Sequence, residues 1–173
     1  NAFTRSGISF KVIGGTAFYD RKEVKDVLAY LQLINNNRDD IRLRRIINEP
    51  KRSIGDTTVN KAAEIAAELG VSVFEVMRHA DEYAALSRSA AKISGFCNMI
   101  DSLTEYAEDA SISELFEQVI NVTGYKAMLE NDGEEGRDRL NNVMELSSNI
   151  LQYELENDAP TLAEFLEQIA LIS

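Results

Sequence analysis

The sequence predicts a mainly α-helical domain that begins with one short strand. Apolar residues recur every three or four positions along most of the chain, as they do on one face of a helix. Four segments begin with a capping residue that is followed three positions later by glutamate. Only residues 8–13 alternate apolar and polar side chains as a strand does.

The composition is typical of one globular domain. The 173 residues are enough for a single core. Hydrophobic residues make up 45% of the chain and charged residues 27%, a composition that excludes disordered, fibrous and membrane-embedded proteins. No apolar run approaches the roughly 18–20 residues that cross a bilayer, and we expect a cytoplasmic protein. Cys97, the single cysteine, is expected to be a buried thiol in a reducing compartment.

The predicted strand ends at Gly14 and Gly15, whose permissive backbones suit either a hinge or an ordinary turn. A lone strand cannot satisfy its backbone hydrogen bonds. We therefore expect it to pair with a segment outside this sequence, which would make the chain a piece of a longer protein.

The helices follow in order after Gly15. The four capping pairs are Asp20 with Glu23, Ser72 with Glu75, Ser111 with Glu114, and Thr161 with Glu164. Further helices are predicted near 40–48, 57–69, 87–109 and 134–156.

The charge is unevenly distributed. The formal net charge of −11 resolves into +5 for residues 1–52, −2 for residues 53–100 and −14 for residues 101–173. Electrostatic attraction to phosphate decays over about one Debye length, ~8 Å at physiological salt. A basic N-terminal third can therefore bind nucleic acid although the whole chain is acidic.

Residues 42–58 predict two helices joined by a tight loop, the layout of a helix-hairpin-helix. Pro50 disfavours helical geometry at Glu49, and a second helix is expected to begin with Asp56 or Thr57 as its cap and to stop at Gly70.

Within this loop, Ile54 is expected to plug the two helices together while backbone N–H groups of Ser53, Ile54 and Gly55 point outward. A helix N-terminus with free N–H groups suits a phosphate oxygen. Lys51 and Arg52 would add charge without reading base sequence. The alternative is a solvated loop between packed helices.

Several stretches resemble one protein family. Residues 14–31, GGTAFYDRKEVKDVLAYL, resemble the segment GGxxFYxRxEIKDxLAYLR, and residues 45–58 resemble RIINxPxRGIGxxT. Residues 124–129, 139–145 and 171–173 resemble its later GYxxML, RLENLxE and ALIS stretches. In this order the motifs resemble the UvrD/PcrA/Rep-like superfamily 1 DNA helicases.

The resemblance implies a helical 2B subdomain at residues 16–173, preceded at residues 1–15 by the end of motor subdomain 2A and a hinge at Gly14 and Gly15. It implies a longer protein that uses ATP and Mg to move 3′ to 5′ along DNA in the bacterial cytosol, with 2B swivelling and gripping the duplex. Its partners would be the junction between duplex and single-stranded DNA, the remaining motor domains and DNA-repair proteins. The implied DNA-binding residues are Arg45, Lys51, Arg52, Ser53, Ile54, Gly55, Thr57 and Thr58.

Two positions depart from the family pattern. Ser53 replaces the first glycine of the GIG loop, so the loop is strained if this position needs a positive φ, and Asn141 replaces a glutamate. The sequence also has no GxxxxGK[ST] phosphate loop. We therefore expect no cofactor, catalytic residue or metal ligand in this chain, which alone should neither hydrolyse ATP nor unwind DNA.

Two functions remain open from the sequence. The chain either grips duplex DNA through the 51–55 loop, or acts mainly as a regulatory and protein-docking module through its acidic C-terminal part. Convergence of the loop with Arg42 and Arg45 favours DNA, and carboxylates around the loop favour docking.

Overall fold

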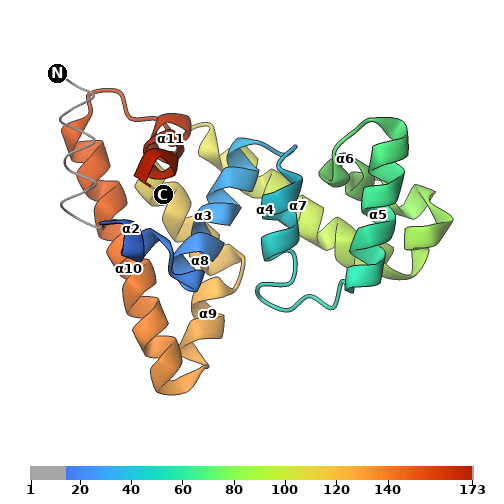
Figure 1. Ribbon diagram of the computed structural model, residues 1–173, viewed down its shortest axis with the longest axis horizontal. Helices are drawn as coiled ribbons and strands as arrows, with labels where there is room; N and C mark the ends of the chain where they lie inside the picture. The colour runs from blue at the N-terminus through green and yellow to red at the C-terminus, as the bar shows by residue number, and fades with distance from the viewer. Residues whose placement is uncertain (1–14, 173) are drawn as a thin grey trace.

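Residues 15–172 are described by a computed structural model, and all the regular structure in this range is helical (Figure 1). The strand expected at residues 8–13 and Gly14, the first residue of the expected hinge, lie outside the described residues, whereas Gly15 is the first residue of α2. The α-helices are α2 (Gly15–Tyr19), α3 (Lys22–Asn35), α4 (Asp40–Ile46), α5 (Asp56–Leu69), α6 (Val73–Arg78), α7 (Ala90–Ala107), α8 (Ile112–Val122), α9 (Tyr125–Glu130), α10 (Gly133–Glu156) and α11 (Leu162–Ile172). Two 3-10 helices, η1 (Ala80–Glu82) and η2 (Ala84–Ser89), precede α7.

Helix α3 is the centre of the molecule. It contacts α2, α4, α7, α8, α10 and α11, and Val24, Val27 and Leu31 on its predicted apolar face are completely buried. Figure 1 shows α10 along one side, α5 and α6 at the opposite end, and α7 running between them. The predicted mainly α fold is therefore confirmed for the described residues.

Three of the four predicted helix caps are confirmed. Ser72 and Thr161 each accept a hydrogen bond from the backbone N–H three residues later, and Ser111 with Glu114 forms the complete reciprocal capping box. These side chains satisfy N–H groups that the first helical turn cannot.

The predicted cap at Asp20 is wrong. Helix α2 ends at Tyr19, and the following turn makes Arg21 the residue before α3. Glu23 accepts a hydrogen bond from the Asn142 side chain of α10, at 2.7 Å, instead of returning to the backbone. A contact between distant helices has replaced the local motif.

Two predicted boundaries also change. The helix expected at 87–109 begins as the 3-10 helix η2 and becomes α-helical only at Ala90. The helix expected near residue 57 begins at Asp56, so its N-cap is Gly55 and neither Asp56 nor Thr57. Gly70, with φ of 70°, ends this helix as predicted.

Candidate nucleic-acid interface

The loop between α4 and α5 is the predicted phosphate-binding hairpin, and it lies at an edge of the molecule (Figure 1). Ile54 is completely buried, as predicted for the apolar plug. Lys51, Ser53 and Gly55 are exposed on either side of it. The loop thus combines a buried anchor with an accessible backbone.

The side chain of Asn48 holds the loop closed. Its Nδ2 donates to the Ile54 carbonyl at 2.6 Å, and its Oδ1 accepts from the N–H groups of Ile54 at 3.1 Å and Arg52 at 3.4 Å. The Ile54 N–H is therefore used inside the loop and does not point outward, which corrects the prediction for this group. Sequence reasoning missed Asn48, although asparagine at the end of a helix commonly bonds to nearby backbone.

Ser53 has the left-handed backbone that a glycine would adopt more easily. Its φ is 60°, the one positive φ among the non-glycine residues described. A side chain at such a position is disfavoured by contact between Cβ and the backbone. The predicted strain at the replaced glycine is thus present.

The N-terminus of α5 faces outward beside this loop. Gly55 is its N-cap, and no side chain of the described residues caps this end. The first N–H groups of a helix have no partner within it and carry partial positive charge. Asp56 and Thr57 are exposed and Thr58 is half-buried, so this turn is accessible to an anion.

The guanidinium of Arg52 turns into the molecule, although Lys51 beside it is exposed. Its Nη1 donates to the carbonyls of Ile46 and Ile47, both at 2.8 Å, and its Nη2 donates to the Tyr30 hydroxyl at 2.5 Å. Two neighbouring cations in the sequence thus have opposite orientations in the structure.

Arg45 is held by a buried carboxylate. Its Nε donates to Asp26 Oδ1 at 2.9 Å, and the Asp26 side chain, only 2% exposed, also accepts from Lys22 at 2.7 Å and from the Tyr125 hydroxyl at 2.7 Å. Burial, followed by the charge of Asp26, raises the pKa of Tyr125 well above its ordinary value. The Asp26 network joins α3, α4 and α9.

Two shallow hollows flank the loop and share three residues, Asn48, Glu49 and Asp56. One hollow also includes Lys51, Ser53, Ile54, Gly55 and Met128. The other includes Arg44, Arg45, Ile47, Val59 and Asn60. Arg42 turns instead toward Gln32 and Asp39. The structure therefore brings Arg45 next to the loop, but it also places two carboxylates there.

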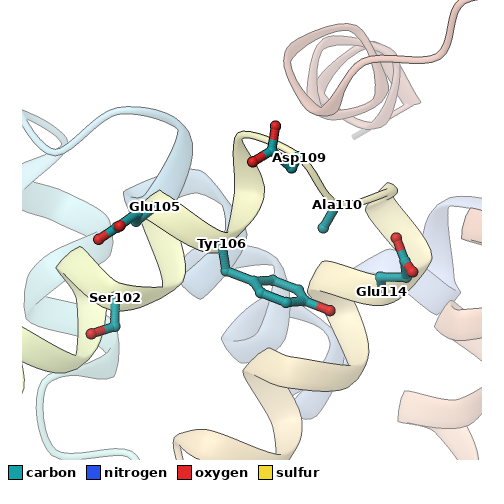
Figure 2. A pocket seen from close by; sticks show the side chains of 6 residues that line it. All are labelled: Ser102, Glu105, Tyr106, Asp109, Ala110 and Glu114. Atoms are coloured by element: carbon teal, nitrogen blue, oxygen red, sulfur yellow. The ribbon is translucent and has the colours of Figure 1, made fainter.

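A third hollow lies between the end of α7 and the start of α8 (Figure 2). It is lined by Ser102, Glu105, Tyr106, Asp109, Ala110 and Glu114. Tyr106 is 40% exposed, and Figure 2 shows its ring extending from α7 toward the first turn of α8. We call this the acidic hollow.

His79, the single histidine of the sequence, pairs with two carboxylates. His79 lies on the surface between Glu75 and Glu82, at 3.2 and 2.9 Å, and these hydrogen bonds raise its pKa. Within residues 15–172 no group of three or more His, Cys, Asp or Glu side chains could hold a metal ion. In the same range, no helix has both the length and the apolar character needed to span a bilayer.

The amino-acid sequence matches the model of a known family over its whole length. The profile of the UvrD-like helicase C-terminal domain matches residues 1–173. The chain belongs to the UvrD-like helicase C-terminal domain family. The family resemblance noted from the sequence motifs is therefore confirmed.

Relatives in this family are bacterial DNA helicases. The chain is 39% identical over 170 residues to the ATP-dependent DNA helicase PcrA of Bacillus subtilis (strain 168), an alignment that covers 98% of this chain and 23% of that protein. It is 37% identical over 175 residues to the ATP-dependent DNA helicases PcrA of Staphylococcus aureus (strain Mu50 / ATCC 700699) and Staphylococcus epidermidis (strain RP62A), covering 99% of the chain and 24% of each. The chain spans about a quarter of the length of these UvrD-like helicases.

Proposed function

We propose that this chain is the helical 2B subdomain of a longer ATP-dependent 3′ to 5′ DNA helicase, and that it holds the duplex backbone ahead of the unwinding junction. The observation that carries the proposal is the α4–α5 loop, where a buried Ile54 and the Asn48 hydrogen bonds present Lys51 and the uncapped start of α5 to solvent. The names of the relatives support DNA as the ligand.

The contacts are assigned by accessibility. Lys51 supplies charge, the backbone at Ser53 and Gly55 and the first turn of α5 at Thr57 and Thr58 supply N–H donors, and Arg45 borders the loop. Ile54 and Arg52 stabilise the loop from inside the fold. These groups recognise phosphate and not bases, which suits a domain that follows duplexes of any sequence.

The remaining functions of the helicase belong to the rest of the longer protein under this proposal. Motor domains outside this chain bind ATP and Mg, because the chain has no phosphate loop. Gly14 and Gly15 form the hinge on which the subdomain swivels against subdomain 2A. Its setting is the bacterial cytosol, with the DNA junction, the motor domains and DNA-repair proteins as partners.

Lys51→Ala in the full-length helicase tests the proposal. Loss of one phosphate contact reduces the slope of log Kd against log salt by about 0.9, so the weakening relative to the parent should be roughly 3.5-fold larger at about 50 mM than at about 200 mM salt. The measurement is a titration with a labelled duplex carrying a single-stranded tail, from about 50 to about 200 mM salt. ATPase activity stimulated by single-stranded DNA should stay unchanged, because the ATP site lies elsewhere.

Lys92→Ala is the matched control, since Lys92 is also an exposed lysine but lies on α7. It should leave the slope for the tailed duplex unaltered. If Lys51→Ala and Lys92→Ala give the same Kd at every salt concentration, the loop does not hold the duplex.

The acidic hollow favours a second candidate function, docking of a basic segment of the motor or of a partner protein. Glu105, Asp109 and Glu114 surround the exposed Tyr106, whose ring could also receive a cation (Figure 2). If this is the main function, Lys51→Ala leaves both duplex affinity and its salt dependence unchanged. The same titration therefore separates the two candidates.

A further inference from the structure

The guanidinium of Arg52 connects the candidate phosphate-binding loop to four other parts of the fold. Besides Ile46, Ile47 and Tyr30, it donates to the Thr123 carbonyl at the end of α8, at 3.4 Å. Its central carbon lies 5.2 Å from the centre of the Phe96 ring of α7 and 5.8 Å from that of Tyr30. Elements distant in the sequence therefore meet on one loop side chain.

These contacts fit the chemistry of the groups involved. The carbonyls of Ile46 and Ile47 end α4, where carbonyl oxygens lack helical partners and carry partial negative charge. A guanidinium satisfies two of them at once and stacks on aromatic rings. Arg52 thus stabilises the end of the helix from which the loop departs.

Tyr30 extends the same connection back to the loop. Its hydroxyl donates to the Glu49 carbonyl at 2.5 Å and accepts from Arg52. Burial raises the pKa of Tyr30 to about 12, which keeps the hydroxyl protonated as this donor. Arg52, Tyr30 and Glu49 therefore form a continuous hydrogen-bonded chain around the hairpin.

We infer that Arg52 is a positioning residue, which holds the α4–α5 loop in its phosphate-binding shape and does not itself contact DNA. This inference rests on the proposed duplex-gripping function and assigns different roles to two adjacent cations. Lys51 contacts phosphate as a charge. Arg52 affects binding indirectly, because its planar guanidinium holds the loop in shape with a set of donors that lysine lacks.

Arg52→Lys and Lys51→Arg in the full-length helicase separate the roles, because both keep the charge. Lys51→Arg should bind the tailed duplex as the parent does. Arg52→Lys should weaken binding about tenfold if the binding-competent loop falls to about one-tenth of the population. The salt slope should stay unchanged, since no phosphate contact is lost.

Hydrogen exchange provides a second measurement that does not depend on DNA. Arg52→Lys should speed exchange of the Ile54 N–H, which is bonded to Asn48 within the loop. Lys51→Ala should leave this exchange rate unaltered. A folded Arg52→Lys variant with unchanged exchange and affinity would overturn the inference.

The two proposals fail in different ways. If Arg52→Ala reduces the salt slope by about 0.9, Arg52 contacts phosphate and the inference is wrong, while duplex gripping stands. If Lys51→Ala has no effect but Arg52→Lys speeds loop exchange, the positioning role stands and the duplex-gripping function is wrong.

Discussion

Lys51, Arg52 and Ser53 are consecutive residues with three different tasks. Lys51 is exposed, Arg52 bonds inward to the ends of α4 and α8, and Ser53 turns the chain with a φ of 60°. These three neighbouring residues therefore contribute to the loop in different ways. Each can be tested by a separate substitution.

Ser53→Gly should stabilise the chain by about 0.5 kcal/mol. Removing a side chain from the left-handed region relieves roughly 1–2 kcal/mol, of which the greater backbone freedom of unfolded glycine cancels about 0.5–1 kcal/mol. The measurement is the free energy of unfolding in urea. Ser148→Gly, inside helix α10, should instead destabilise by about 0.5 kcal/mol. A destabilising Ser53→Gly would show that the serine side chain is needed at this turn.

At the level of elements, helix starts were predictable where the cap is local. The motif at Ser111 uses residues three positions apart, so the sequence contains both partners. The motif at Asp20 has the same spacing, but α2 ends immediately before it and Asn142 of α10 takes the glutamate. Tertiary contacts therefore decide between identical local patterns.

Ser111→Ala should lower the free energy of unfolding by about 1 kcal/mol, because the Glu114 N–H loses its partner at the start of α8. Urea unfolding followed by circular dichroism measures the change. Ser148→Ala, an exposed helix-interior position, should change stability by less than about 0.5 kcal/mol. Equal effects of the two substitutions would contradict a capping role.

The loop shows the limit of prediction from sequence. Its helix–loop–helix layout and the buried Ile54 follow from local patterns, and the strain at Ser53 follows from the glycine that the family motif has at this position. The inward course of Arg52 does not, because its partners Tyr30, Phe96 and Thr123 lie on three other elements. The same holds for Arg45, whose partner Asp26 is buried only once α3, α4 and α9 have packed together.

At the scale of the whole molecule, the uneven distribution of charge bears on how the chain could approach a duplex. The −14 segment at residues 101–173 comprises the last turns of α7 and the helices α8 to α11, and it borders the α4–α5 loop at Thr123 and Met128. Repulsion between the acidic helices and phosphate would therefore favour one orientation on a duplex. Glu49 and Asp56 beside the loop limit the local positive potential.

The stability of the chain should fall between pH 10 and about pH 12. Burial raises the pKa of Tyr19 and of Tyr30 from 10.0 to about 12. Above pH 10 the unfolded chain loses these protons while the folded chain keeps them, so stability decreases as pH rises and is fully present below this window. The effect is on the order of 2 kcal/mol for each tyrosine.

Urea unfolding at a series of pH values, with tyrosinate absorbance recorded in parallel, measures this fall. Tyr106→Phe is the control, since Tyr106 is 40% exposed and should leave the pH profile unchanged. Normal ionisation of every tyrosine near pH 10 in the folded chain would contradict the expectation.

The attachment of the loop has a mechanical consequence. Arg52 joins it to α3, α7 and the end of α8, and Asn48 closes it on itself. Tension applied to the loop by a bound duplex would pass directly into the central helices, with little slack in the hairpin. Under the proposed function, the domain would then move with the bound duplex as one body, and the proposed hinge at Gly14 and Gly15 would take up its rotation.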